Sequence, residues 1–302
     1  MAGMNREYKD RLFKFIFGRE ENKAWTLSLY NALNRTDYTN VDDVSLSTIE
    51  DAVYMGMKND VSFLFSGEMN LYEHQSSYNP NMPLRYLMYS GQLYSKYVDQ
   101  YGVYLYSTRT QTIPAPKCVC FYNGTEEKKE SFDLKLSDAY GGRAGDIEVV
   151  VHMININYGK SRELFERCKP LGEYSWFVDR VRTYQKEILP LVKNTDEALM
   201  MAVGRALEEM PDDFQIKSFL LINRAEVTEM CITEYDEVRN NELLRAECFA
   251  EGRKEGEAKG RAEGTIRTLL RMIKKGLLTE DEAATDANMT IAEFRKLARD
   301  YA

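Results

Sequence analysis

The chain has 302 residues, a net charge of −8, and a composition that is 44% hydrophobic and 29% charged. This balance predicts a water-soluble protein with a core large enough for one large domain or two modest ones. No window approaches the ~20 apolar residues that span a bilayer, so we expect no membrane association. The negative charge disfavours a protein whose whole surface binds nucleic acid, because phosphate neutralisation dominates such binding. The net negative charge is nevertheless compatible with a local basic groove.

The chain has too few histidines to favour a zinc site or a histidine-based nucleophilic triad. The only histidines are His74 and His152, and the five scattered cysteines lack the spacing of zinc ligands. His152 lies within an apolar run, which favours a core or sheet-edge position over a ligand role. The N-terminus lacks the apolar stretch of a secretory signal, so a cytoplasmic protein is expected.

Residues 5–33 are predicted to form one or two helices, the first ending at Gly18. An apolar stripe at helical spacing marks the first helix. Its members are Leu12, Phe13, Ile16 and Phe17. Strand character follows over residues 44–57.

A β-hairpin is predicted over residues 60–75, with a turn at Ser66 and Gly67. Apolar and polar side chains alternate along its first strand, as they do when one face is buried. The two faces are Asp60, Ser62 and Leu64 on one side and Val61, Phe63 and Phe65 on the other.

Two carboxylates meet in this hairpin. With Ser66 and Gly67 as the turn, Asp60 lies directly opposite Glu73, with the Cβ atoms about 5 Å apart. Like charges so placed are unfavourable unless a cation lies between them, and Mg²⁺ is held by one or two carboxylates, water and substrate phosphate. Gln75 points to the same side as Glu73. The alternative is a pair of solvated charges at a sheet edge.

A helix is predicted over residues 84–101, after a loop that ends in a proline suited to a first helical turn. Arg85, Tyr89 and Gln92 lie on roughly one side of it. From there Arg85 would reach a DNA phosphate. The alternative is a helix that covers the sheet and exposes these polar groups.

Two apolar runs, over residues 116–124 and 147–156, are typical of buried strands. A charged loop over residues 125–131 lies between them. Beyond Tyr158 the pattern turns helical, and the expected segments are 171–192, 195–210 and 214–250.

Several stretches form a recognisable set. They are Asp10-x-x-Phe13-Lys14, Asp60, Glu73-His74-Gln75-Ser76-Ser77 followed by Met82, Arg85 and Tyr89, and Val119 to Gly124. Together they resemble the recombination-promoting nuclease family, also labelled transposase, of the PD-(D/E)XK nuclease superfamily. The resemblance is good over roughly residues 5–125 and looser beyond.

The resemblance implies an α/β fold, with a PD-(D/E)XK (restriction-endonuclease-like) core of mixed β-sheet flanked by helices and then an α-helical C-terminal region. It implies a metal-dependent DNA endonuclease linked to DNA recombination or mobile elements. Asp60 and Glu73 would bind Mg²⁺ or Mn²⁺, Gln75 would orient water or complete the metal shell, and Arg85 would hold a DNA phosphate.

The chain departs from the wider superfamily at its third signature position, where lysine is usual and Gln75 stands here. Within the family that it resembles, glutamine is usual at this position. The missing positive charge would come from Lys14 or Lys58, and Asp10 is a secondary site candidate. The alternative function is a catalytically weak or inactive DNA-associated or regulatory binding protein on a nuclease fold.

Glycines recur every four residues from Gly252 to Gly264, which predicts either a marginal helical tether or a face that lets another helix approach. Two capping boxes follow, Thr279-x-x-Glu282 and Thr290-x-x-Glu293. They predict a small helix-turn-helix-like module that reads DNA or mediates homo-oligomerisation. The expected domains are 1–157 (nuclease-like core), 158–250 (helical extension), 251–264 (tether) and 265–302 (helical module).

Overall fold

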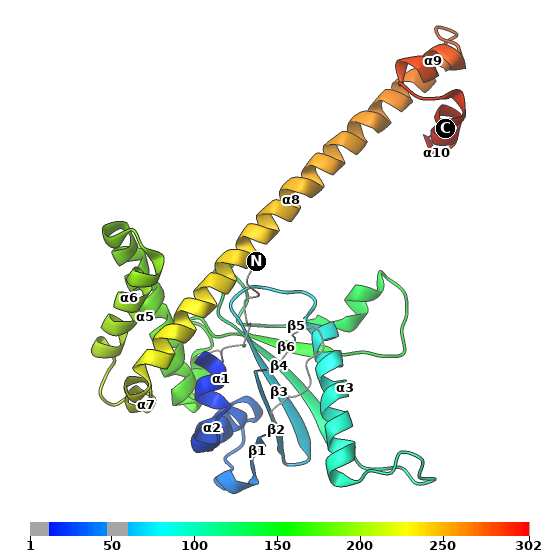
Figure 1. The fold of residues 1–302 in the computed structure, drawn as a ribbon. Coiled ribbons are helices and arrows are strands. Elements are labelled where there is room, and N and C mark those ends of the chain that lie inside the picture. The colour runs from blue at the N-terminus through cyan, green and yellow to red at the C-terminus, as the bar shows by residue number, and fades with distance from the viewer. Residues whose placement is uncertain (1–11, 47–59, 302) are drawn as a thin grey trace, which may run out of the picture. The chain divides into compact units, whose positions relative to one another are not determined.

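The structure is a computed structural model that describes residues 12–46 and 60–301. It divides into two compact units, one ending at Val238 and the other beginning at Arg239. The first unit contains a six-stranded mixed β-sheet with helices packed on it, and the second is helical (Figure 1). This confirms the prediction of an α/β protein followed by a helical C-terminal region. In the described part of the chain, no helix combines the length and apolar character needed to span a bilayer.

The sheet has the strand order β1-β2-β3-β4-β6-β5. Its strands are β1 (Ser45–Leu46), β2 (Val61–Phe65), β3 (Glu68–Gln75), β4 (Ala115–Tyr122), β5 (Ser131–Lys135) and β6 (Val150–Asn155). The pairs β1–β2, β2–β3 and β5–β6 are antiparallel, whereas β3, β4 and β6 run parallel to one another. The carboxyl ends of these three strands therefore meet at one edge of the sheet.

The predicted hairpin is present with the predicted register. Phe65 pairs with Glu68, which leaves Ser66 and Gly67 as the two turn residues. Both have positive φ, 51° and 75°, as a type I′ turn requires. This turn type matches the right-handed twist of the strands and so fixes which residues of β2 and β3 are opposite one another.

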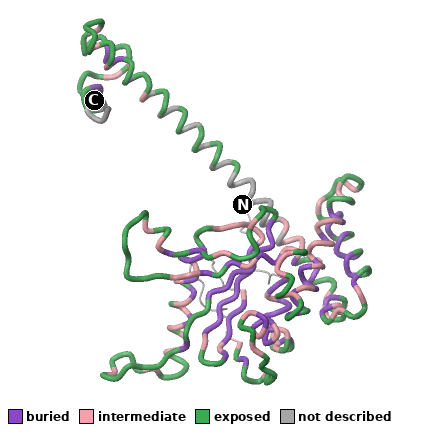
Figure 2. The backbone as a smooth tube through the Cα atoms, turned by 180° about the vertical axis from the view of Figure 1, so that it is seen from behind, coloured by how far each residue is buried: buried purple, intermediate pink, exposed green. Residues whose placement is uncertain are grey.

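Helices cover both faces of the sheet. On one face, a large core packs β2 and β4 against α1 (Leu12–Phe17), α2 (Lys23–Asn34), α5 (Lys169–Val192), α6 (Thr195–Glu209) and the start of α8 (Arg224–Lys274). On the other face, a smaller core packs the sheet against α3 (Met82–Tyr101). Consequently β3 and β4 are buried for most of their length (Figure 2).

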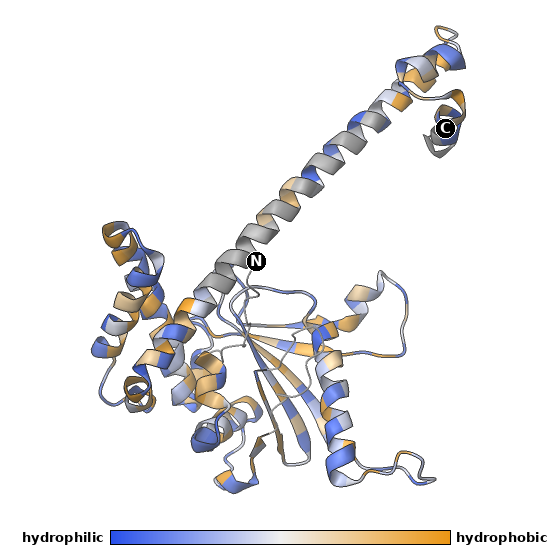
Figure 3. Ribbon diagram, viewed as in Figure 1, coloured by the Kyte–Doolittle hydropathy of each residue, from blue (hydrophilic) through white to orange (hydrophobic). Residues whose placement is uncertain are grey.

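The short helices complete the first unit. They are α4 (Arg162–Arg167), α7 (Lys217–Ile222) and the single-turn helices η1 (Glu20–Asn22), η2 (Val41–Asp43) and η3 (Leu136–Tyr140). Hydrophobic and hydrophilic residues are mixed along the strands, and β3 is mostly hydrophilic although it is buried (Figure 3). Helix α3 is also mostly hydrophilic, as expected for a helix with one face on the sheet and the other in water.

Three expectations about the elements need correction. β5 begins at the last residue of the loop predicted over residues 125–131, and the sequence predicts no strand for the rest of it, because a short edge strand that is mostly exposed has little apolar signal. The expected helix over residues 214–250 is divided into α7 and α8 at Asn223. β6 begins at Val150 and not at Ile147. Most of the strand expected over residues 44–57 lies outside the described residues.

The second unit contains the end of α8 with α9 (Glu280–Asp286) and α10 (Ile291–Tyr301). Both predicted capping boxes are confirmed by hydrogen bonds between Thr279 and Glu282 and between Thr290 and Glu293. Ile266, Leu269, Ala283, Ala284 and Phe294 form its core. The four regularly spaced glycines belong to α8, and a Cβ at any of them would meet nothing within 4 Å.

Two glycines of the first unit should respond oppositely to alanine. A Cβ at Gly124 would lie 2.5 Å from the Ser76 backbone oxygen, so Gly124→Ala is expected to destabilise the unit by about 1–3 kcal/mol. A Cβ at Gly91, inside α3, meets nothing within 4 Å, so Gly91→Ala should stabilise by about 0.5–1 kcal/mol. Urea unfolding followed by tryptophan fluorescence reports on this unit, because Trp25 and Trp176 both belong to it. Equal shifts in the two variants would contradict the tight contact at Gly124.

Candidate functional site

The candidate site lies on β3, near the carboxyl ends of the parallel strands. Alternation along β3 places Glu73 and Gln75 on the face covered by α3 and His74 on the opposite face. The register continues one step beyond the Val61–Tyr72 pair to bring Asp60 opposite Glu73. The Oδ2 atom of Asp60 accepts a hydrogen bond of 2.7 Å from the backbone N–H of His74, which fixes the carboxylate against β3.

Glu73 is the most buried member of the site. Its side chain is 1% exposed, and its Oε1 atom lies 2.5 Å from a guanidinium nitrogen of Arg85, which is 21% exposed. The Nε2 atom of Gln75 donates to the same carboxylate oxygen at 3.1 Å. A carboxylate so deeply buried requires a charged partner, because a lone buried charge costs several kcal/mol. Arg85, in the first turn of α3, supplies it.

Tyr89 holds Arg85 in place. Its hydroxyl accepts hydrogen bonds from Nε of Arg85 at 3.1 Å and from the nitrogen that contacts Glu73 at 2.7 Å. Burial raises the pKa of Tyr89 well above its ordinary value, and the negative charge of Glu73 raises it further. The phenol therefore stays protonated at neutral pH. Tyr89 is a neutral orienting group for Arg85 and not a base.

An aromatic cluster on the opposite face of β3 brings together the separate sequence stretches that resembled a nuclease family. The His74 ring stacks on Phe13 with centroids 5.6 Å apart, and Phe13 lies 5.1 Å from Phe121. Nε2 of His74 is 3.0 Å from the hydroxyl of Tyr174. The residue between Glu73 and Gln75 is thus anchored by α1, β4 and α5.

A hydrogen-bonded network extends this anchor to the end of β4. Asn123 donates to the Tyr174 hydroxyl at 3.4 Å, and Arg182 donates to the Asn123 backbone oxygen at 2.5 Å and to its side-chain oxygen at 3.2 Å. Sequence reasoning missed Tyr174 and Arg182, which lie on α5. Helical periodicity marks that helix, but nothing in the sequence links it to β3.

The structure thus gathers Asp60, Glu73, Gln75 and Arg85 at one place. Lys14 lies on α1, which packs on the other face of the sheet. Lys58 and Asp10 lie outside the described residues.

His152 occupies β6 with an exposed side chain, and its Nδ1 atom lies 2.8 Å from Oδ1 of Asp133. The sequence favoured a core or sheet-edge position for it. The structure gives it an exposed position beside the edge strand β5, in contact with a carboxylate of that strand.

The donors of the site suit a hard divalent cation. Asp60 and Glu73 offer carboxylate oxygens and Gln75 offers an amide oxygen, which are the ligand types of Mg²⁺. Across residues 12–46 and 60–301, no three or more His, Cys, Asp or Glu side chains gather into a metal-binding group. An ion at this place would therefore complete its shell with the amide, water and a phosphate, as Mg²⁺ commonly does.

Comparisons with known proteins add no assignment. No family model, no curated protein and no solved structure matches this chain. The interpretation of the site therefore depends on its own geometry and chemistry.

The Glu73–Arg85 pair should behave as a buried ion pair. Arg85→Met strands the Glu73 charge and is expected to lower the free energy of unfolding by about 3 kcal/mol, whereas Glu73→Gln combined with Arg85→Met should recover most of that loss. Urea unfolding followed by tryptophan fluorescence measures both. The matched control is Arg205→Met, which removes an exposed arginine–glutamate pair and should change little. A double variant as unstable as Arg85→Met would show that the charge pair is not the reason for the loss.

Proposed function

We propose that this protein is a metal-dependent DNA endonuclease whose site is formed by Asp60, Glu73, Gln75 and Arg85. The observation that carries the proposal is the convergence of two carboxylates and an amide at the end of the β2–β3 hairpin, with an arginine paired to Glu73. This combination provides hard cation ligands beside a phosphate-binding cation.

The arrangement of elements supports the proposal. The chain order of helix, three strands, helix and strand, with β4 parallel to β3, agrees with the order implied by a PD-(D/E)XK core. The acidic residues lie on the hairpin and the basic residue lies on the following helix. The proposed link to DNA recombination or mobile elements is based only on the sequence resemblance.

In the mechanism, the carboxylates of Asp60 and Glu73 would hold Mg²⁺ or Mn²⁺, and the amide oxygen of Gln75 would orient the attacking water or join the metal shell. A bound divalent ion supplies a water of lowered pKa and stabilises negative charge on the scissile phosphate. Arg85 has a separate task. Its guanidinium neutralises Glu73 in this structure, and it would hold a phosphate oxygen when DNA is present.

The neutral Tyr89 keeps this arrangement ordered. Its hydroxyl binds Arg85 through two nitrogens, which restricts the guanidinium to the neighbourhood of Glu73. Asp60, held by the His74 backbone N–H, has its orientation set by β3 itself. The site is therefore preorganised by the fold, a property that transition-state stabilisation requires.

A second candidate function is a DNA-associated or regulatory binding protein that does not cleave DNA. The observation in its favour is that Glu73 is almost fully buried and already neutralised by Arg85. The lysine that is usual at position 75 of the wider superfamily is also absent. On this hypothesis Glu73–Arg85 is a structural ion pair.

Nicking of supercoiled plasmid separates the two hypotheses. We expect wild-type protein to nick the plasmid with Mg²⁺ or Mn²⁺ and not with EDTA. Asp60→Asn and Glu73→Gln should each lower the rate by about 100-fold or more, because each removes a metal-binding charge with little change in shape. The matched control is Asp133, an acidic residue of β5 that contacts His152. Asp133→Asn should leave the rate unchanged.

The outcomes are distinct. Nicking that persists in both site variants would refute this site. A folded wild-type protein that binds DNA without metal-dependent nicking would favour the binding-protein hypothesis. Loss of activity in Asp133→Asn as well would indicate a general effect of removing acidic residues.

A further inference from the structure

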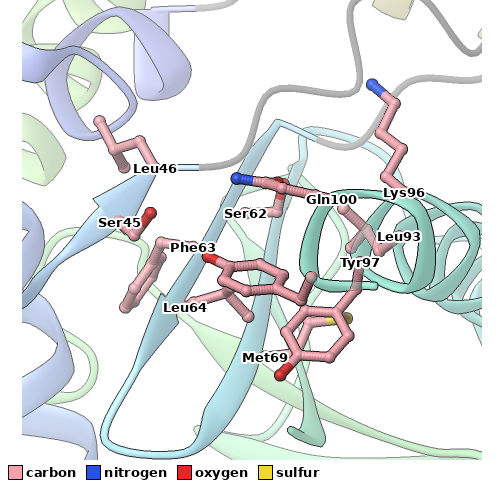
Figure 4. Close-up of a pocket in the computed structure, with 11 residues that line it drawn as sticks. Ser45, Leu46, Ser62, Phe63, Leu64, Met69, Leu93, Lys96, Tyr97 and Gln100 are labelled. Atoms are coloured by element: carbon pink, nitrogen blue, oxygen red, sulfur yellow. The ribbon is translucent and has the colours of Figure 1, made fainter. Parts of the chain in front are cut away.

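A groove of about 290 Å³ lies between α3 and the strands β1 and β2, on the same face of the sheet as Glu73 (Figure 4). We call it the α3 groove. Met69 and Leu93 give it apolar walls, and Ser62, Lys96, Tyr97 and Tyr101 line it with polar and aromatic groups. Its size is near the lower end of sites that hold small ligands, and its mixed lining is typical of them.

The α3 groove is formed by the same elements as the candidate site, at positions further along β2 and α3. Ser62 follows Asp60 by two positions on the same face of β2, about 7 Å along the strand. On α3, Arg85, Gln92 and Lys96 recur at a spacing that places them on one side of the helix. The Oε1 atom of Gln92 is buried and has no hydrogen-bond partner among the described residues. A polar strip thus leads from Arg85 into the groove.

Tyrosines gather at the far end of this strip. The rings of Tyr97 and Tyr101 are stacked with centroids 4.5 Å apart and an interplanar angle of 30°. Tyr101 is 51% exposed, and Tyr104 and Tyr106 beyond the end of α3 are 64% and 87% exposed. The stacked Tyr97–Tyr101 pair, with Tyr101 half exposed, offers an aromatic face on which a base can stack.

We propose that the α3 groove binds unpaired DNA, with a base stacked on the Tyr97–Tyr101 platform and a phosphate paired with Lys96. The inference rests on the proposed nuclease function and deepens it by naming the substrate class: DNA that carries a single-stranded segment beside the scissile phosphate. Base–aromatic stacking combined with a basic side chain is how proteins hold single strands without reading their sequence.

Stacking favours a single strand over a duplex as the occupant. The whole chain carries a net charge of −8, so phosphate neutralisation alone supplies little affinity. Stacking does not depend on net charge, but it needs a base whose face is free, and the bases inside a duplex are already stacked on one another. A groove that pairs one lysine with two stacked tyrosines therefore suits an unpaired base.

The length of α3 fits a short strand. At ~1.5 Å of rise per residue, Tyr101 lies about 24 Å along α3 from Arg85. That span equals about seven stacked nucleotides at ~3.4 Å each. The platform would therefore hold a part of the strand several nucleotides from the phosphate at Arg85.

Binding of labelled oligothymidylate by the full chain in EDTA tests the proposal, because EDTA removes any hydrolysis. The probe has about twelve nucleotides, within the range of known single-strand site sizes. Tyr97→Leu and Tyr101→Leu should each raise Kd about five- to tenfold, while Tyr101→Phe should stay within about twofold of wild type. The matched control is Tyr158→Leu, whose tyrosine is 50% exposed outside the groove and should leave Kd unchanged.

Lysine variants test the phosphate contact separately. Lys96→Gln should lower the slope of log K against log salt by about 0.7, the value for one phosphate contact on a single strand. The control is Lys186, an exposed residue of α5, which packs on the opposite face of the sheet. Lys186→Gln should leave the slope unchanged. A duplex of the same length should bind more weakly than the single strand.

Unchanged affinity in both leucine variants, or equal affinity for the duplex, would overturn the inference. Failure here is distinguishable from failure of the proposed function. Metal-dependent nicking without tyrosine-dependent binding would refute the α3 groove alone. Tyrosine-dependent binding without nicking would refute the hydrolytic function alone.

Discussion

Burial of β3 on both of its faces shapes the layout of this protein, because the buried Glu73 and His74 near the end of the strand need polar partners inside. Glu73, with 1% of its side chain exposed, satisfies this requirement with Arg85 and Gln75 on the α3 face. His74 satisfies it with Tyr174 on the other face. Arg85 lies on α3 and Tyr174 lies on α5, so the positions of these two helices on opposite faces of the sheet follow in part from the buried polar residues of β3.

The buried charge of Glu73 also links the stability of the fold to the metal site that we propose. A carboxylate in a low-dielectric environment attracts cations strongly, whether the cation is a guanidinium or a divalent ion. Arg85 fills this role in the present structure. A divalent ion bound by Asp60 and Glu73 would take over the neutralisation of Glu73 and release Arg85 for a phosphate. The need to neutralise Glu73 can thus be met either by Arg85 or by the proposed divalent ion.

Much of the site could be predicted from sequence because it depends on short-range rules. A two-residue Ser66–Gly67 turn and an alternation of period two suffice to place Asp60 opposite Glu73. The contact between Glu73 and Arg85 could not be derived, because it depends on how α3 lies across the sheet. Tyr174 is a hundred positions from His74, and no local pattern connects them. β5 was missed because an exposed edge strand carries little apolar signal.

The candidate site and the α3 groove both come mainly from the segment that runs from Asp60 through β2 and β3 to the end of α3. A segment this local can carry a recognisable motif, because few long-range contacts are needed to bring its residues together. It cannot hold its shape alone, because a two-stranded hairpin is marginal in water. The distant residues Phe13, Phe121 and Tyr174 supply the missing core behind His74. The residues of the proposed site are thus concentrated in one stretch of chain, while the rest of the first unit contributes rigidity.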